Sequence, residues 1–491
     1  MIAPWAQEEL ATADFGDERL DARAVLLLSA LGRRPNLSIP AACGGRAEMH
    51  AAYRFFDNDK VTFAKVLEPH CTRTRQRVAE QPVALLVQDT TEIDLTRPEQ
   101  EVAGAGDLDG TRRGFLLHDL QAYTPDGTPL GSVWADILNR TEGVSHASTA
   151  AKQTRRKQEP IEEKESLRWL TGLREARALA QETPNTQCIC IADSEADIYE
   201  LFAEPRGERP VHWLIRACQN RALESDTPLP HLREQVLTAP LLYEVELLIR
   251  GRQAKTAAEE RARRQNRQTR QARVEVRAAT LTLRAPRRPD RQLPPITVQV
   301  VLVREASPPP SEIAVEWLLL TTLPIDSPEQ VQRIVAYYCV RWNIEVFFRT
   351  LKSGCRIERR RFEHVERLLP CLAVCLIVTW RTLLVCRLGR ECPELDCETL
   401  FEPCEWQAVW VAVHGKKLPK QAPRLSELVH LIAGLGGYVE RPNSEPGAQT
   451  VWIGLQRMYD LAWAWESFGP QAKNGRVLSG LSALQGIFIV L

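Results

Sequence analysis

The segment Pro82-Val-Ala-Leu-Leu-Val-Gln-Asp89 is an apolar run that ends in an acidic residue. A short, continuous apolar run is typical of a strand buried on both faces of a sheet. A second run, Cys188-Ile-Cys-Ile-Ala192, ends in the same way at Asp193. Because adjacent parallel strands end at one crevice of an α/β sheet, we expect Asp89 and Asp193 to lie close together.

The residues between the two runs predict a β-hairpin and a helix. Two alternating segments, Phe115–Tyr123 and Leu130–Leu138, flank Asp126-Gly127, a dipeptide that favours a tight hairpin turn. Apolar residues then recur at helical spacing over residues 162–181. Strand, hairpin, helix and strand is the opening order of a ribonuclease-H-like α/β domain, which is the fold that we expect for the central part of the chain.

After a further strand at residues 211–217, the pattern predicts a mostly β insertion over about residues 218–312. Its alternating segments are Tyr243–Ile249, Val274–Leu283 and Ile296–Val303. From Arg250 to Arg291 there are 14 Lys or Arg against 4 Asp or Glu. This stretch is either a solvated basic loop or a surface that contacts a DNA backbone, and the sequence leaves both readings open.

Helical periodicity dominates both ends of the chain. We predict a helical N-terminal domain over residues 1–78, an α/β domain over 79–388 and a helical C-terminal domain over 389–491. The apolar stretch Leu368–Leu388 contains Arg381 and predicts a buried helix rather than a membrane span.

Composition excludes several classes of protein. The chain has 63 basic and 63 acidic residues, with 44% hydrophobic and 26% charged residues, as in ordinary soluble proteins. Its 13 cysteines form no Cys-x-x-Cys pair, so we interpret them as buried thiols and not as zinc or redox centres. No phosphate loop, dinucleotide fingerprint or Gly-x-Ser-x-Gly motif is present. The first ten residues lack the pattern of a secretory signal, so we expect a cytoplasmic protein without membrane partners.

A well-marked helix follows the strand predicted at residues 315–322. Ser327, Pro328 and Gln330 form its start signals, and Gly354 is its stop signal. Four polar residues lie along one stripe of this helix: Tyr338, Arg341, Glu345 and Lys352. Alone, the stripe could be a solvent face with a weak Arg341–Glu345 pair.

Together with Asp89 and Asp193, however, Glu345 completes a set of three carboxylates on different elements. Mg²⁺ prefers oxygen ligands. Two such ions about 3.5–4 Å apart can stabilise the attacking and leaving oxygens of a phosphoryl transfer. The pattern therefore indicates metal-dependent phosphoryl transfer, with the cations of the stripe holding phosphates.

The sequence resembles the Tn5-like members of the IS4 insertion-sequence group, which are bacterial DDE transposases, over essentially its whole length. The most specific match is Tyr338-x-x-Arg341-x-x-x-Glu345-x-x-x-x-x-x-Lys352, the Y, R, E, K signature of that group. Asp89-Thr-Thr91 resembles the first-acid motif, and Asp193-Ser-Glu-Ala-Asp197 the second. The second motif more often reads Asp-Arg-Glu-Ala-Asp, so Ser194 puts one phosphate contact in doubt, but not the metal site.

The resemblance implies a cut-and-paste DNA transposase. Such an enzyme nicks one strand at each end of a transposon, forms and resolves a hairpin there, and joins the freed ends to target DNA. It implies that Asp89, Asp193 and Glu345 are catalytic and hold two Mg²⁺ ions, for which Mn²⁺ can substitute. It further implies double-stranded DNA as partner, end binding by the N-terminal domain, dimerisation by the C-terminal domain in a homodimeric synaptic complex, and association with the nucleoid when the protein is bound to DNA. The DNA-binding residues that it implies are Tyr338, Arg341, Lys352, Trp317, Trp342 and Arg216. Trp317 can also be read as a core residue and Arg216 as a lone surface arginine.

Two other functions stay open from the sequence: a catalytically inactive relic or inhibitor that binds DNA, and a nuclease that cuts without joining. His118 and Asp119 could form a catalytic dyad. We interpret them instead as hairpin residues near the acidic crevice, because no nucleophile accompanies them.

Overall fold

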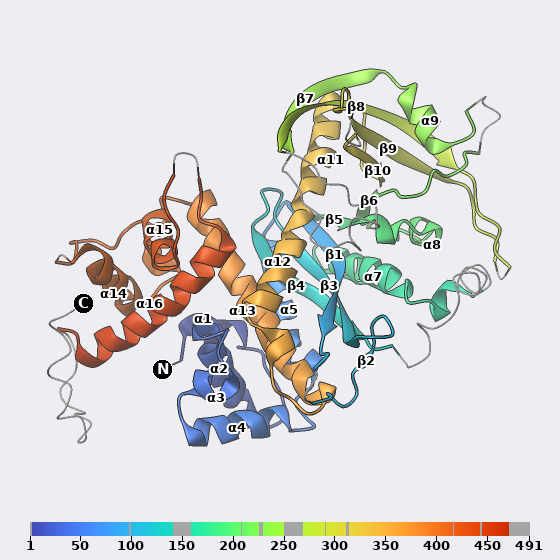
Figure 1. Cartoon of the computed structure of the whole chain (residues 1–491). Helices are drawn as coiled ribbons and strands as arrows, with labels where there is room; N and C mark the ends of the chain where they lie inside the picture. The colour runs from blue at the N-terminus through green and yellow to red at the C-terminus, as the bar shows by residue number, and fades with distance from the viewer. Residues whose placement is uncertain are drawn as a thin grey trace. The chain divides into compact units, whose positions relative to one another are not determined.

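The computed structural model describes residues 2–97, 100–140, 159–207, 209–224, 229–249, 269–289, 291–310, 314–415, 417–441 and 444–470. The chain divides into two compact units, Met1–Leu384 and Val385–Leu491, which are described separately (Figure 1). The basic residues predicted between 250 and 268 lie outside the described residues, so the two readings of that stretch stay open.

A large mixed β-sheet forms the centre of the first unit. Its strands are β1 (Val83–Asp94), β2 (Gly106–Asp107), β3 (Arg113–Tyr123), β4 (Pro129–Leu138), β5 (Gln187–Ala192), β6 (His212–Arg216), β7 (Leu241–Ile249), β8 (Arg270–Leu283), β9 (Ile296–Glu305) and β10 (Glu316–Thr321). The strand order is β2-β3-β1-β5-β6-β10-β9-β8-β7, and β4 pairs with β3. The predicted hairpin of β3 and β4 is confirmed, as are the strands predicted at both apolar runs.

The register of the sheet brings the two predicted acids together. β1 and β5 are parallel, and Leu85 pairs with Ile189 and Val87 with Ile191. Asp89 and Asp193 are each two residues further along. The prediction that the first strand ends at Asp89 is wrong: β1 continues to Asp94 because β3 still pairs with it there after β5 has ended.

The β-rich residues after β6 extend the same sheet. β7, β8 and β9 form antiparallel pairs, and β9 joins the central strands through β10, which pairs with β6 (Figure 1). The strands predicted in this region are confirmed, but they continue the central sheet and do not form a separate β layer.

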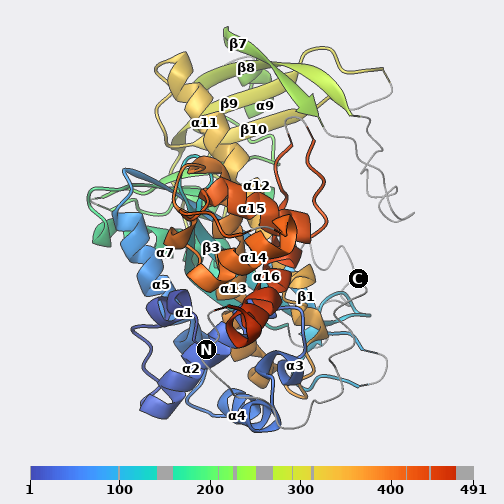
Figure 2. The same ribbon diagram turned by 90° about the vertical axis from the view of Figure 1, so that its left-hand side faces the viewer.

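Helices cover the central strands and make up the N-terminal part of the first unit (Figure 2). They are α1 (Pro4–Glu9), α2 (Glu18–Arg33), α3 (Ile39–Cys43), α4 (Arg46–Phe56), α5 (Phe63–Ala79), α7 (Leu167–Glu182), α8 (Tyr199–Phe202), α9 (Leu232–Leu237), α11 (Pro328–Val340) and α12 (Trp342–Ser353). Leu86 of β1 and Trp169 of α7 belong to one buried cluster. Since strand residues alternate between faces, Gln88 and Thr90 lie on this α7 side, whereas Asp89 points to the other side.

The predicted helix from Ser327 to Gly354 is divided in two. The predicted capping box of Ser327 and Gln330 is present, but α11 ends at Val340 and α12 begins at Trp342. Arg341 donates its backbone N–H to Tyr338 O at 3.1 Å, and Ile344 donates to Arg341 O at 3.2 Å. These bonds reach back three residues instead of four, so the helix tightens locally at Arg341.

The second unit is helical in its described residues. It contains the end of α13 (Val365–Glu391), then α14 (Pro403–His414), α15 (Leu425–Leu435) and α16 (Ala448–Phe468), with a core that includes Leu428, Ile432 and Met458. By length and composition α13 could cross a membrane, but 83% of its most apolar stretch is buried within the protein. The prediction of a buried helix at Leu368–Leu388 agrees with this burial.

Candidate active site

Three elements carry the predicted catalytic carboxylates. Asp89 lies within β1, and Asp193 follows β5 and caps the short helix η2 (Ser194–Ala196). Glu345 lies in the first turn of α12. Backbone amides orient the two aspartates: Thr90 N donates to Asp89 Oδ1 at 2.7 Å, and Glu195 N donates to Asp193 Oδ1 at 2.8 Å.

Burial and neighbouring negative charge act together on Asp89. Its side chain is 15% exposed. Burial, followed by the charges of Asp193 and Glu345, raises the pKa of Asp89 to about 7, against the lowering effects of the Thr90 amide and Arg341. Asp193 and Glu345 are therefore both close enough to Asp89 for their charges to act on it. Such an oxygen-rich group fits a divalent cation such as Mg²⁺.

Arg341 occupies the space between two of these acids. Its Nη1 lies 3.2 Å from Asp89 Oδ2, and its Nη2 pairs with Glu345 Oε1. Among the residues that the structure describes, no three His, Cys, Asp or Glu side chains converge closely enough to hold one metal ion. By their chemistry the three carboxylates fit a divalent metal, but in this arrangement the guanidinium of Arg341 lies between Asp89 and Glu345.

Several predicted DNA-binding residues lie beside the acids. Tyr338 is buried and makes an edge contact with Trp317, with 5.7 Å between the ring centroids. The Cζ atom of Arg341 lies 5.9 Å from the centroid of the Tyr338 ring. Burial raises the pKa of Tyr338. The nearby charge of Arg216 lowers this pKa, and the charge of Asp193 raises it. The structure therefore brings Tyr338, Arg341, Trp317 and Arg216 near the acids.

Among the described residues, Trp342 and Lys352 form no hydrogen bond or ion pair with Asp89, Asp193 or Glu345. Trp342 is 61% exposed, as expected for a residue that could stack on a base but has no partner within the described chain. Lys352 Nζ lies 3.5 Å from Glu358 Oε1, and the same oxygen accepts from Asp94 N at 3.2 Å. Lys352 is thus held at the far end of β1.

Three family models match successive parts of the chain. They are "Transposase DNA-binding" at residues 2–61, "Transposase DDE domain" at 170–377 and "Transposase Tn5 dimerisation domain" at 377–464. The chain belongs to the Tn5-like DDE transposases. This assignment is consistent with the IS4 group, and the family normally uses a divalent metal. The DDE match includes Asp193 and Glu345, whereas Asp89 precedes it.

The matched domains indicate what kinds of molecule this transposase binds. A DNA-binding domain and a dimerisation domain support binding to DNA and to a second copy of the chain. The DDE domain supports phosphoryl transfer on DNA.

The other aspartate of the second motif, Asp197, has a structural role in this transposase. Asp197 is buried, and its Oδ2 accepts from the backbone amides of Cys218 and Gln219, both at 2.8 Å. Its Oδ1 pairs with Arg221 at 2.5 Å. Asp197 therefore anchors the chain after β6 to the motif.

The structure also reveals that Arg168, which the sequence pattern did not single out, lies beside residues of both acid motifs. Thr90, Glu195 and Arg168 form a hydrogen-bonded group with His118, which lies on β3 as the hairpin interpretation expected. Arg168 is 78 residues from Thr90 in the sequence, so no short-range spacing could have identified the contact.

Proposed function

We propose that this transposase excises a DNA element and joins it to target DNA by metal-dependent phosphoryl transfer. The proposed steps are nicking at each end, hairpin formation by attack of the freed 3′-hydroxyl, hairpin opening, and strand transfer. We further propose that the central sheet is ribonuclease-H-like. The order β4-β3-β1-β5-β6, with β1, β5 and β6 parallel and β3 antiparallel to β1, supports this fold.

The observations that carry the proposal are the DDE match and the arrangement of three carboxylates from distant parts of the chain, in which Arg341 pairs with Asp89 and Glu345 and the charge of Asp193 acts on buried Asp89. Asp89, Asp193 and Glu345 would hold the metal ions, with Mg²⁺ as the proposed metal and Mn²⁺ able to replace it. Bound there, divalent ions supply an activated water or hydroxyl and stabilise the leaving oxygen.

The remaining side chains would hold and distort DNA. Arg341 can grip a backbone phosphate with two parallel N–H donors, and Tyr338 can donate its hydroxyl to another. Exposed Trp342 offers a ring on which an unstacked base could lie, which offsets part of the cost of bending the end into a hairpin. Trp317 supports Tyr338 from β10, and Lys352 and Arg216 add charge for the DNA backbone.

We propose a homodimer that holds both element ends in a synaptic complex. The matched dimerisation domain supports self-association, and the matched N-terminal domain supports end binding. We propose a cytoplasmic protein that associates with the nucleoid when it is bound to DNA.

A cleavage assay tests this function. Purified protein is mixed with labelled duplex DNA that carries the candidate end and its flank, with and without Mg²⁺, beside Asp193→Asn. We expect Mg²⁺-dependent release of the flank and a hairpin-ended element, both lost in the variant. End binding without any cutting would favour the inactive DNA-binding relic, and cutting without strand transfer would favour the stand-alone nuclease.

A further inference from the structure

Arg168 connects three segments of the chain through one guanidinium group. It is the second residue of α7, and its side chain is 14% exposed. Its Nε donates to Thr90 Oγ1, its Nη2 to Glu195 Oε2 and its Nη1 to the carbonyl oxygen of Glu165, each at 2.9 Å. A planar guanidinium has a fixed donor geometry, so these three bonds fix the relative positions of their acceptors.

Two of these acceptors belong to residues that orient the proposed metal ligands. The backbone amide of Thr90 donates to Asp89, and the backbone amide of Glu195 donates to Asp193. Arg168 therefore binds the side chain of each residue whose main chain holds a catalytic aspartate. It does so from the α7 side of the sheet, without contacting the aspartates themselves.

The hydroxyl of Thr90 links Arg168 to His118 by accepting one hydrogen bond and donating another. Because Arg168 donates to Thr90 Oγ1, the hydroxyl proton is free to be donated to His118 Nδ1 at 2.8 Å. Burial lowers the pKa of His118 to about 3, so the ring is neutral and can accept at Nδ1. Its Nε2 then donates to Gln88 Oε1 at 3.1 Å.

A glycine on α7 leaves room for the Gln88 end of these hydrogen bonds. Gly172 is one turn after Arg168, on the same helix face. A Cβ atom at Gly172 would lie 2.3 Å from Gln88 Oε1, which is too close for a carbon. A side chain at Gly172 would therefore displace the Gln88 amide that accepts from His118.

We infer that Arg168 is a positioning residue that joins the first and second acid motifs and sets the separation and orientation of Asp89 and Asp193. The inference rests on the proposed function, in which these two carboxylates hold the metal. Residues that hold metal ligands through hydrogen bonds commonly contribute about 10- to 100-fold to metal affinity. We expect an effect of that size for Arg168.

The test measures Mn²⁺ binding to the full-length protein by calorimetry and by the electron paramagnetic resonance of free Mn²⁺. Arg168→Gln removes the charge, and Arg168→Lys keeps the charge but not the forked donors. Both are expected to weaken Mn²⁺ binding by about 10- to 100-fold. Thr90→Val, which removes the shared hydroxyl, should weaken it as well, whereas Thr90→Ser should restore the affinity of the wild type.

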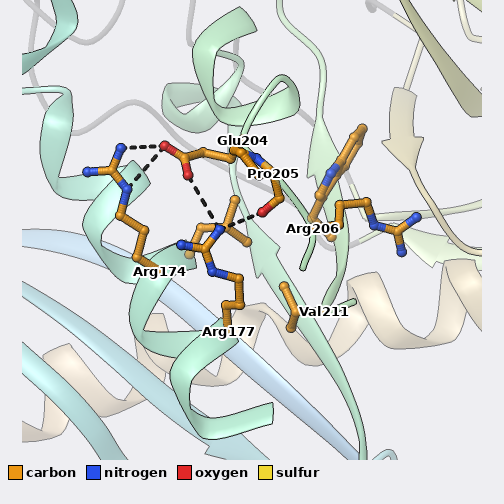
Figure 3. Close-up of a pocket in the computed structure, with 8 residues that line it drawn as sticks. Arg174, Arg177, Glu204, Pro205, Arg206 and Val211 are labelled. Carbon is orange, nitrogen blue, oxygen red and sulfur yellow. Dashed lines mark hydrogen bonds and ion pairs between the residues drawn. The ribbon is translucent and has the colours of Figure 1, made fainter. Parts of the chain in front are cut away.

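Arg174 provides a matched control on the same helix. It pairs with Glu204 at the small pocket in Figure 3, and its Nε donates to Glu204 Oε1 at 3.1 Å. Arg174→Gln also removes an arginine ion pair from α7, but should leave Mn²⁺ affinity unchanged. End-DNA binding and thermal midpoints, measured in parallel, should stay near wild type for Arg168→Lys and Thr90→Val.

The outcomes separate this inference from the proposed function. Wild-type Mn²⁺ affinity in Arg168→Lys would refute positioning by the forked geometry, and wild-type affinity in Arg168→Gln would refute any role at the metal site. If Asp89→Asn and Asp193→Asn do not weaken Mn²⁺ binding, the proposed metal site itself is wrong. If those two variants lose binding and the Arg168 and Thr90→Val variants do not, only the inference about Arg168 fails.

Discussion

Replacing Asp89 by Asn should stabilise the metal-free protein at alkaline pH, although it removes a proposed catalytic group. The folded structure raises the pKa of Asp89 from 3.8 to about 7, mainly by burial and by the charges of Asp193 and Glu345. A raised carboxyl pKa means that the folded state binds the proton more tightly than the unfolded state does. The ionised carboxylate therefore opposes folding.

The size and the pH window of this effect follow from the two pKa values. The difference between 3.8 and about 7 corresponds to about 4 kcal/mol at about 1.4 kcal/mol per pKa unit. The destabilisation by ionised Asp89 is absent below pH 3.8, grows as the pH rises from 3.8 to about 7, and is complete above about pH 7. The charge of Arg341 already lowers this pKa, so the loss of its 3.2 Å ion pair with Asp89 is included in that difference, and we expect a net gain of about 4 kcal/mol at pH 8.

Urea unfolding of the metal-free protein at pH 5 and pH 8, followed by near-ultraviolet circular dichroism, measures this gain. Asp119→Asn is the matched control, because Asp119 pairs with Asp89 across β1 and β3 and burial also raises its pKa to about 7. Both variants should be more stable than wild type at pH 8, with smaller gains at pH 5. Added Mg²⁺ should stabilise wild type and Asp119→Asn but not Asp89→Asn. Equal or lower stability of Asp89→Asn at pH 8 would refute the reasoning.

Three further predictions concern the catalytic, DNA-binding and structural residues. Asp193→Asn and Glu345→Gln should each abolish Mg²⁺-dependent cleavage, while band-shift assays show end binding near wild type. A variant that loses end binding as well as cleavage would indicate a structural role for that residue. Lys352→Ala should weaken DNA binding equally across sequences and reduce the slope of log affinity against log salt by about 1; an unchanged slope would exclude a phosphate contact. Arg221→Ala leaves the buried carboxylate of Asp197 without its ion pair and should cost about 3 kcal/mol in urea unfolding, so a change below about 1 kcal/mol would contradict the anchoring role.

The elements next to the site could be predicted because their signals are local. The apolar runs before Asp89 and Asp193 predicted buried strands, and their parallel pairing then determines that the two acids lie together. The capping box at Ser327 was likewise predictable, since it needs only residues three positions apart.

The features that could not be predicted depend on contacts between distant residues. The helix interruption at Arg341 accompanies an ion pair with Asp89, which is 252 residues away in the sequence. Arg168 lies in a helix whose periodicity indicates only which face is buried, so its link between Thr90 and Glu195 follows from tertiary packing. The continuation of β1 to Asp94 depends similarly on its pairing with β3.

Hydrogen bonding distinguishes two kinds of aspartate within the second acid motif. Asp197 is satisfied on both oxygens by two backbone amides and by Arg221, and so has little capacity to accept a ligand. Among the described residues, the side chain of Asp193 accepts only from the amide of Glu195, although a carboxylate offers about four acceptor positions. A carboxylate held by one backbone bond is oriented but still free to coordinate. The same motif thus provides one aspartate that stabilises the fold and one that is available for the proposed metal.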